Sequence, residues 1–294
     1  MEEVREYWKN GQLKEEGNIE NGEREGEWRL YYPSGKLSVI GQWKDGEREG
    51  EFMCWHENEQ LKELFNCKNG ELDGVTYSWY ANGQLETEGK YKAGEKEGTW
   101  KTYHENGQLK IEGQYKDNYK DGEWKYFDEN GKLEKIVDGM GKCKEYDKNG
   151  QLEAEGKYKA EEKEGTWKFY HKNGQLKAEG QYKAGELEGE WKDYYDNGQI
   201  KEITNFGSEF PFEKYMFLEE DWKTYPNGKY KSYYENGQLK EEGQYRYGEK
   251  EGQWKTFDEK GKLKETKIYK DGEEVEKKKI IIPKKTKTKE GNER

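Results

Sequence analysis

The sequence contains three histidines, which are the side chains best suited to general acid–base catalysis: His56, His104 and His171. A catalytic base must occupy one defined position, because it has to reach the proton that it removes. Each of these histidines lies three residues before the same recurring turn position. At the position of the histidine, other copies of the turn have Tyr, Trp or Asp. The many Glu residues recur in register as well and do not form a paired acid and base. We therefore expect structural or surface roles for these residues and no enzymatic activity.

Phosphate, metal and thiol chemistry have equally weak signatures. The segment GMGK at 139–142 resembles part of a phosphate-binding loop, but the full spacing with a following Ser or Thr is missing, which favours a shortened turn. The cysteines Cys54, Cys67 and Cys143 share no CxxC spacing, so neither a zinc site nor a disulfide framework is indicated. We expect free thiols, no metal and no cofactor.

The composition limits the fold that could carry a site. Of 294 residues, 30% are hydrophobic and 40% are charged, which is too polar for a thick buried core. Disordered chains are poor in aromatic residues, whereas 15% of this chain is aromatic, with 11 Trp and 24 Tyr. We expect a folded chain whose apolar content lies in aromatic rings. The sequence enters the turn motif at once and has no apolar run of membrane-spanning length, so we expect a cytoplasmic protein.

One turn motif recurs along almost the whole chain, for example as YHENGQLK at 103–110 and YYENGQLK at 233–240. Most copies are 24 residues apart, which identifies a repeat array. Asn-Gly favours a two-residue type I′ hairpin turn, because that turn needs positive φ at both central residues. We expect a β-hairpin at each of the eleven copies, which are centred on Gly11, Gly35, Glu59, Gly83, Gly107, Gly131, Gly150, Gly174, Gly198, Gly237 and Gly261.

The strand register follows from the turn. With Asn106 and Gly107 at the turn, Lys101 lies opposite Glu112, and such opposite charges stabilise a strand pair. An aromatic ring over a strand glycine covers backbone that glycine leaves bare. Applied to all copies, this register predicts a repeat framework of Trp28 over Gly41, Trp100 over Gly113, Trp167 over Gly180, the turn residues Asn106, Gly107, Gly174 and Gly237, and Leu109 after the turn.

A second glycine-rich turn, as in YKAGEKEGTW at 91–100, would connect each hairpin to the next. Helical periodicity is absent, and nothing in the sequence resembles a second layer. We therefore predict an all-β fold, an elongated single-layer antiparallel sheet of about eleven tandem 24-residue hairpins in a solenoid-type array. At ~4.8 Å per strand its length would be on the order of 100 Å, and its aromatic face would be partly exposed.

The unit Y-x-x-N-G-x-L-x-x-x-G-x-Y-x-x-G-x-x-x-G resembles the MORN repeat variant of bacterial proteins over residues 1–272. The resemblance implies the hairpin sheet described above. It also implies a protein-interaction role, because many bacterial proteins of this type are similar to YwqK-type antitoxins, which neutralise a toxin partner. The order of glycines and aromatics differs from the classical eukaryotic unit, so the lipid binding proposed for that group is not expected here.

Two departures interrupt the array. Near 131–150 the spacing falls to 19 residues, which predicts a shortened repeat, and near 199–228 it rises to 39 residues around an irregular aromatic insertion. The insertion is either a degenerate repeat with its own small core or an exposed site for a partner. Its candidate partner-binding residues are Phe206, Phe210, Phe212, Tyr215, Phe217, Trp222 and Tyr225.

The C-terminal residues 273–294 form a basic tail with a short apolar run, which we expect to be flexible. Contact of this tail with nucleic acid or an anionic surface is one alternative. A strand at 279–282 that closes the edge of the last hairpin is another.

These features favour a non-catalytic protein-binding repeat protein, of the antitoxin or immunity type that neutralises a toxin by direct binding. The net charge of −11 suits a basic partner, such as a basic toxin, and should repel nucleic acid and anionic lipid. We expect membrane contact at most through the tail. Two alternatives stay open: a membrane-associated or cell-architecture scaffold, and a secreted effector or adhesin.

Overall fold

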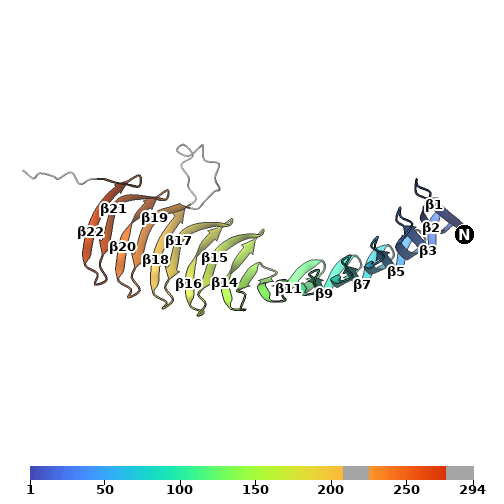
Figure 1. Ribbon diagram of the computed structural model, residues 1–294, viewed down its shortest axis with the longest axis horizontal. Coiled ribbons are helices and arrows are strands. Elements are labelled where there is room, and N and C mark those ends of the chain that lie inside the picture. The colour runs from blue at the N-terminus through green and yellow to red at the C-terminus, as the bar shows by residue number, and fades with distance from the viewer. Residues whose placement is uncertain (208–224, 276–294) are drawn as a thin grey trace, which may run out of the picture. The chain divides into compact units, whose positions relative to one another are not determined.

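The computed structural model describes residues 1–207 and 225–275, and every regular element in these two ranges is a β-strand (Figure 1). The chain divides into two compact units, unit 1 at residues 1–174 and unit 2 at residues 175–294. In each unit, strands that follow one another in sequence pair in antiparallel fashion. The predicted all-β architecture of tandem hairpins is confirmed. No helix in the described ranges is long and apolar enough to span a membrane.

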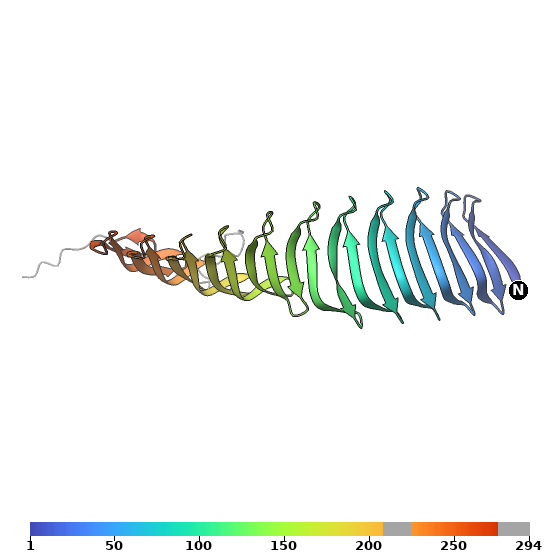
Figure 2. The same ribbon diagram turned by 90° about the horizontal axis from the view of Figure 1, so that it is seen from below.

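Unit 1 is a row of hairpins whose strands lie side by side (Figure 2). Its strands alternate side chains between two faces, so that each strand presents one row of residues to either side. They are β1 (Glu2–Tyr7), β2 (Leu13–Glu20), β3 (Glu23–Tyr31), β4 (Leu37–Lys44), β5 (Glu47–Trp55), β6 (Leu61–Lys68), β7 (Glu71–Trp79), β8 (Leu85–Lys92), β9 (Glu95–Tyr103), β10 (Leu109–Lys116), β11 (Tyr119–Phe127), β12 (Leu133–Asp138), β13 (Lys142–Tyr146), β14 (Leu152–Lys159) and β15 (Glu162–Tyr170).

Unit 2 repeats the same hairpin on both sides of the undescribed residues 208–224. Its strands are β16 (Leu176–Lys183), β17 (Glu186–Tyr194), β18 (Ile200–Gly207), β19 (Tyr225–Tyr233), β20 (Leu239–Arg246), β21 (Glu249–Phe257), β22 (Leu263–Lys270) and β23 (Glu273–Glu274). The short β23 pairs with β22, and the Val275 amide donates to the Ile268 carbonyl at 2.8 Å. The sheet therefore continues for a few residues past position 272, while the rest of the basic tail, with the predicted strand at 279–282, lies outside the described residues.

The turns of the repeated motif are three-residue loops, which corrects the predicted type I′ geometry. Gly107 donates its N–H to the His104 carbonyl at 2.8 Å, and His104 donates to the Gln108 carbonyl at 2.8 Å. Gly107 has φ +84°, whereas Asn106 does not adopt a positive φ. This is a type I turn followed by one left-handed residue. Asn106 acts through its side chain instead, because its Oδ1 accepts the Gln108 N–H at 2.9 Å.

Type I′ turns occur at the opposite end of the strands, in the connectors between hairpins. In the connector of β8 and β9, Ala93 has φ +48° and Gly94 has φ +78°, which is the pair of left-handed residues that this turn requires. Gly94 also donates its N–H to the carbonyl of Leu72, near the start of β7, at 2.8 Å. Each such connector is therefore bonded to the strand that follows the preceding connector.

Away from the motif turn, the register agrees with the sequence alignment. Trp100 lies opposite Gly113 and Lys101 opposite Glu112 in β9–β10. Next to the turn it differs by one residue, since the third loop residue leaves Tyr103 opposite Leu109. The hairpins are consequently paired as expected, with a bulge where each second strand begins.

The repeat between 131 and 150 has shorter strands, six residues in β12 and five in β13, against eight and nine in β10 and β11. Their connection carries the GMGK segment. The Asp138 carboxylate accepts the backbone N–H groups of Met140 and Lys142 at 2.9 and 2.8 Å. Because the protein's own carboxylate occupies these donors, the segment is a capped turn.

Candidate functional site

Side-chain alternation gives each unit two faces, which we name by their residues. The Trp face carries Trp100 and Thr102 in β9 and the residues paired with them in neighbouring strands. The ladder face carries Lys101 and the residues paired with it, such as Glu88 and Glu112.

On the Trp face of unit 1, aromatic rings pack against one another and against the cationic side chains of Lys and Arg. Trp100 is only 6% exposed, although the sheet is one layer thick. Tyr91 and Tyr115 contact its indole edge to face, with ring centroids 5.1 and 5.9 Å away. The Lys96 ammonium lies 4.3 Å from the ring centroid, in cation–π geometry. The expectation of a partly exposed aromatic face is therefore wrong for Trp28, Trp100, Trp124 and Trp167, whose buried indoles form a core one ring thick, whereas Trp43 is half-buried.

Each of these large rings lies on the glycine of the preceding strand, which corrects the predicted ring positions. Gly113 faces Trp100 in the register, but a Cβ added to Gly113 would overlap the indole of Trp124. The ladder explains the difference, because three residues of β11 oppose Gly113 alone and leave room for the ring. The same contact recurs as Trp28 on Gly17, Phe52 on Gly41, Trp100 on Gly89, Trp167 on Gly156, Trp191 on Gly180 and Trp254 on Gly243.

The histidines that could have been catalytic hold neighbouring repeats together. His104 Nε2 lies 3.0 Å from the Phe127 carbonyl, and His56 Nε2 lies 2.8 Å from the Trp79 carbonyl. A carbonyl oxygen only accepts, so in both rings Nε2 carries the proton. Tyr80 makes the same contact with its hydroxyl, at 2.8 Å from the Tyr103 carbonyl. This shared hydrogen bond explains why His, Tyr and Trp interchange at the position.

The recurring acids also have structural partners. Asp73 accepts the Ala93 N–H at 3.2 Å, and Glu97 accepts the Asp117 N–H at 3.3 Å, each in the next connector. On the ladder face, Glu88 accepts the Tyr103 hydroxyl at 2.7 Å. Burial, together with this carboxylate, raises the pKa of Tyr103 to about 12.

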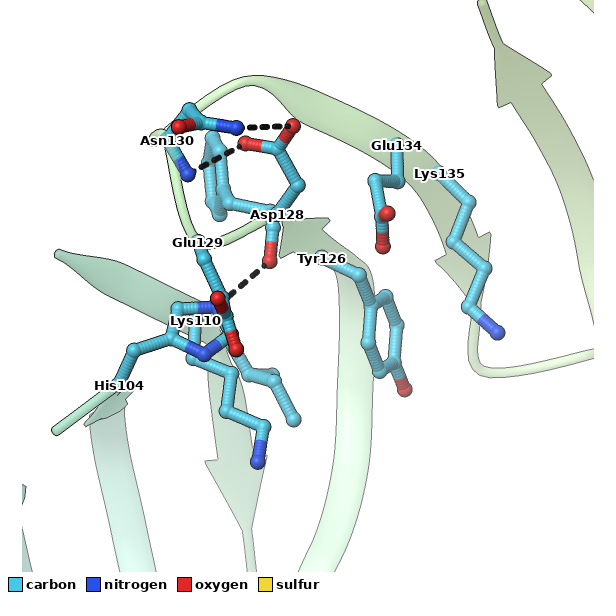
Figure 3. Close-up of a pocket in the computed structure, with 10 residues that line it drawn as sticks. His104, Lys110, Tyr126, Asp128, Glu129, Asn130, Glu134 and Lys135 are labelled. Atoms are coloured by element: carbon cyan, nitrogen blue, oxygen red, sulfur yellow. Dashed lines mark hydrogen bonds between the residues drawn. The ribbon is translucent and has the colours of Figure 1, made fainter. Parts of the chain in front are cut away.

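A pocket of about 500 Å³ lies beside the motif turn that precedes the shortened repeat (Figure 3). His104, Tyr126, Asp128 and Lys135 are among its lining residues. The Asp128 carboxylate accepts the N–H of Asn130 and that of Lys132, both at 2.9 Å, and these bonds lower its pKa. The negative charge of Asp128 is thus engaged in its own turn.

The thiols are free and shielded. All three cysteines are unpaired, and burial raises the pKa of Cys54 and of Cys143 to about 11, which suppresses the reactive thiolate. In the described part of the chain, no group of three or more His, Cys, Asp or Glu could hold a metal ion.

Most of the aromatic candidates for partner binding fall outside the described residues: Phe210, Phe212, Tyr215, Phe217 and Trp222. The two that are described flank the gap. Phe206 is half-buried near the end of β18, opposite Pro226 of β19, and Tyr225 at the start of β19 is 37% exposed. Adjacent strand ends therefore bring these two candidates to the same part of unit 2.

The Trp face of the same strands contains two carboxylates that face each other, Asp193 of β17 and Glu202 of β18. Burial raises the pKa of Asp193, and the charge of Glu202 raises it further. Glu202 accepts hydrogen bonds from the hydroxyls of Thr204 at 2.8 Å and Tyr230 at 3.1 Å. We call Asp193 and Glu202 the acidic pair. Sequence reasoning missed it, although the predicted hairpin register already placed two acids opposite each other.

Comparisons with known proteins identify the repeat. The family model described as MORN repeat variant matches ten segments that cover more than half of the chain: residues 3–21, 24–45, 72–93, 96–117, 120–138, 141–160, 163–184, 187–206, 226–247 and 250–271. Residues 46–71 lie between matched segments, although they form a regular hairpin. No curated protein matches the sequence.

Solved structures give only weak likenesses. The crystal structure of TcdB2-TccC3-Cdc42 is 11% identical with a TM-score of 0.19, and the match covers 91% of this chain and 17% of that one. Alternansucrase in complex with isomaltononaose is 15% identical with a TM-score of 0.19, covering 84% of this chain and 18% of that one. This chain thus spans a small part of either protein, and these likenesses carry no argument about function. The family match does identify the chain, which belongs to the MORN repeat variant family.

Proposed function

We propose that this repeat protein is a non-catalytic protein-binding array whose partner docks beside the acidic pair in unit 2. The observation that supports it is the direct opposition of the half-buried carboxylates of Asp193 and Glu202. Like charges directly opposite each other destabilise a strand pair. A basic side chain supplied by a partner removes this repulsion, so the pair favours the bound state over the free one.

The surroundings of the acidic pair suit a protein surface. Phe206 lies on the same strand and face as Glu202, and the exposed Tyr225 lies at the adjacent strand end. Protein interfaces are enriched in aromatic residues at their centre, with charged groups around them. The net charge of −11 attracts a basic partner over a longer range.

The resemblance to YwqK-type antitoxins extends the proposal to the identity of the partner. In this extended form the partner is a basic toxin, and the array neutralises it by covering its surface. Co-expression with the product of the adjacent gene tests this form. Unchanged toxicity together with no retained protein in a pull-down would refute it.

Docking at the acidic pair is tested with a matched pair of charge-removing variants. Asp193→Asn should reduce the amount of partner retained by the immobilised protein, and the loss should be larger at low salt than at high salt. Removing one of two facing charges should also leave the fold as stable as before or more stable, by about 0.2 to 1 kcal/mol. Glu235→Gln removes the same charge from an exposed turn and should retain the partner fully. Equal retention by both variants would exclude this docking site.

A further inference from the structure

The ladder face of unit 1 has a consistent polar pattern in most repeats. Lys101 lies between Glu88 and Glu112, and its ammonium bonds to Glu88 at 3.3 Å. Towards the motif turn, a Tyr hydroxyl bonds to the same type of Glu, as Tyr31 does to Glu16 at 2.7 Å. A solvated surface of alternating charges is what a one-layer sheet needs to remain soluble.

In β4 to β7 this pattern is replaced by apolar residues. Ile40, Met53, Leu64 and Tyr77 follow one another directly across the four strands, in the row that holds Lys and Glu elsewhere. Trp55 and Trp79 take the place of the Tyr row, and Val75, 46% exposed, lies beside Tyr77. We call these residues the apolar patch: Ile40, Met53, Trp55, Leu64, Val75, Tyr77 and Trp79.

The middle of the patch lies in the part of the sequence that the family model does not match, and its two ends lie in the matched segments 24–45 and 72–93. Met53, Trp55 and Leu64 lie in residues 46–71, the hairpin between two matched segments. The substitutions at these positions affect the ladder face, while Phe52 on the Trp face keeps its place on Gly41. The hairpin has therefore kept its internal core and changed its outer surface, which is the pattern expected of an interface.

The charges at the two ends of the patch are opposite. On the β3 side the ladder row ends in Arg29, and Glu27 lies beside it. On the β8 side it ends in Glu88, and Lys90 lies beside it. In the row of the apolar residues, the patch is thus flanked by a basic residue on the β3 side and by an acidic residue on the β8 side. In the row beside it, the two charges are exchanged.

This arrangement is complementary to itself under one two-fold axis. An axis parallel to the strands, between β5 and β6, would place Arg29 against Glu88 of a second copy and Glu27 against its Lys90. It would also place Met53 against Leu64, so that the apolar rows meet. An axis along the row of strands would place Arg29 on Arg29 and Glu88 on Glu88, which is repulsive. The charges therefore select the first arrangement.

We propose that the apolar patch is a homodimer interface, in which two copies of the chain stack ladder face to ladder face with their strand orders running in opposite directions. Four strands at ~4.8 Å spacing give a contact roughly 20 Å wide. Twisted sheets pack at about 30° to each other, so contact is confined to the patch. Such an interface lies at the small end of specific interfaces, and the dimer should dissociate on dilution in the micromolar range.

The test uses sedimentation equilibrium of the full chain between about 1 and 100 µM, a range that brackets micromolar dissociation constants. The parent chain should pass from monomer to dimer as its concentration rises. Met53→Lys combined with Leu64→Glu restores the ion-pair row of the other repeats and so preserves the fold. This variant should dimerise roughly tenfold more weakly or not at all. Ile136→Glu, which changes an apolar residue of the ladder face in β12 away from the patch, should leave dimerisation unchanged.

The orientation is tested by mixing two charge variants. Arg29→Glu and Glu88→Lys should each be monomeric alone, because like charges then meet at both ends of the patch. Mixed together they should form a heterodimer, in which both ends carry opposite charges again. A parent chain that stays monomeric at the highest concentration overturns the proposal, as does a mixture without heterodimer or a double variant that dimerises like the parent. None of these outcomes depends on the partner proposed for the acidic pair.

Discussion

The strain at one motif turn gives a quantitative test of the repeat geometry. Glu59 occupies the turn position at which every other copy of the motif has glycine, and it has φ +70°. A left-handed conformation costs a residue with a Cβ about 1 to 2 kcal/mol. An ion pair between Glu59 and Lys36, 3.3 Å apart, partly offsets this strain. At the position of Lys36, most other repeats have Gln. The side chains are 41% and 71% exposed, so this pair contributes about 0 to 1 kcal/mol.

Glu59→Gly should therefore stabilise unit 1. At the middle of these ranges the released strain, about 1.5 kcal/mol, outweighs about 0.5 kcal/mol for the exposed ion pair and about 0.7 kcal/mol for the added freedom of the unfolded chain, which leaves a net gain of about 0.3 kcal/mol. A gain of that size raises the midpoint of thermal unfolding by about 1 °C for a unit of this length. Differential scanning calorimetry measures the change. Protection of the β5 and β6 amides in hydrogen exchange locates it.

Glu57→Gly is the matched control, because it makes the same chemical change two residues earlier, at an exposed residue without a positive φ. There, glycine only adds freedom to the unfolded chain and should destabilise by about 0.5 to 1 kcal/mol. If both variants lowered the midpoint equally, the assignment of a strained left-handed residue at position 59 would be wrong.

Three further predictions test the packing and the hydrogen bonds. Gly113→Ala should cost about 1 to 3 kcal/mol in urea unfolding, because its Cβ would overlap the Trp124 indole; an unaltered midpoint would contradict the ring position. His104→Phe should cost about 1 kcal/mol through loss of its hydrogen bond to the next repeat, whereas His104→Tyr should retain most of the stability, and equal losses would argue against that bond. The pKa of Tyr103 is about 12 in the fold and about 10 when unfolded, so its contribution is complete below pH 10 and lost as pH rises towards 12. Tyr103→Phe should accordingly flatten the decline in unfolding midpoint between pH 10 and 12, and parallel curves would refute the linkage.

The hairpin at residues 106 and 107 illustrates how far the sequence predicts local structure. Asn-Gly marks a reversal, and the reversal is where it was expected. The dipeptide fits two turns, however, and the choice depends on contacts beyond the hairpin. The Asn106 amide donates to the Glu129 carbonyl of the next repeat at 2.7 Å while its oxygen caps Gln108. Both bonds favour the three-residue loop, and the bond to Glu129 cannot be predicted from a single hairpin.

The candidate sites, like the turn, could be predicted from the sequence only in part. Alternation along a strand separates Trp100 from Lys101, so the two faces could be predicted from any one repeat. The neighbouring strand that a side chain contacts could not be predicted from one repeat, because that contact depends on the bulge beside each glycine. Trp100 leans onto Gly89, and Lys101 bonds to Glu88, both on the preceding strand. Reading the register of the single hairpin β17–β18 would have revealed the acidic pair, and aligning neighbouring hairpins would have revealed the apolar patch.

A one-layer sheet restricts where function can reside, because its repeated residues are used to hold the layer together. The indole of Trp100 covers backbone, His104 bonds to the next repeat, and Asp73 caps the next connector. Mutating any of these should affect stability before it affects binding. Positions that depart from the repeat without disturbing its core are better candidates for binding. Met53 and Leu64 are such positions, because they replace a charged pair in a hairpin whose core residue Phe52 is only 2% exposed. Selection for stability alone gives no reason to place those side chains outward, so a partner surface is the physical explanation that the two substitutions share.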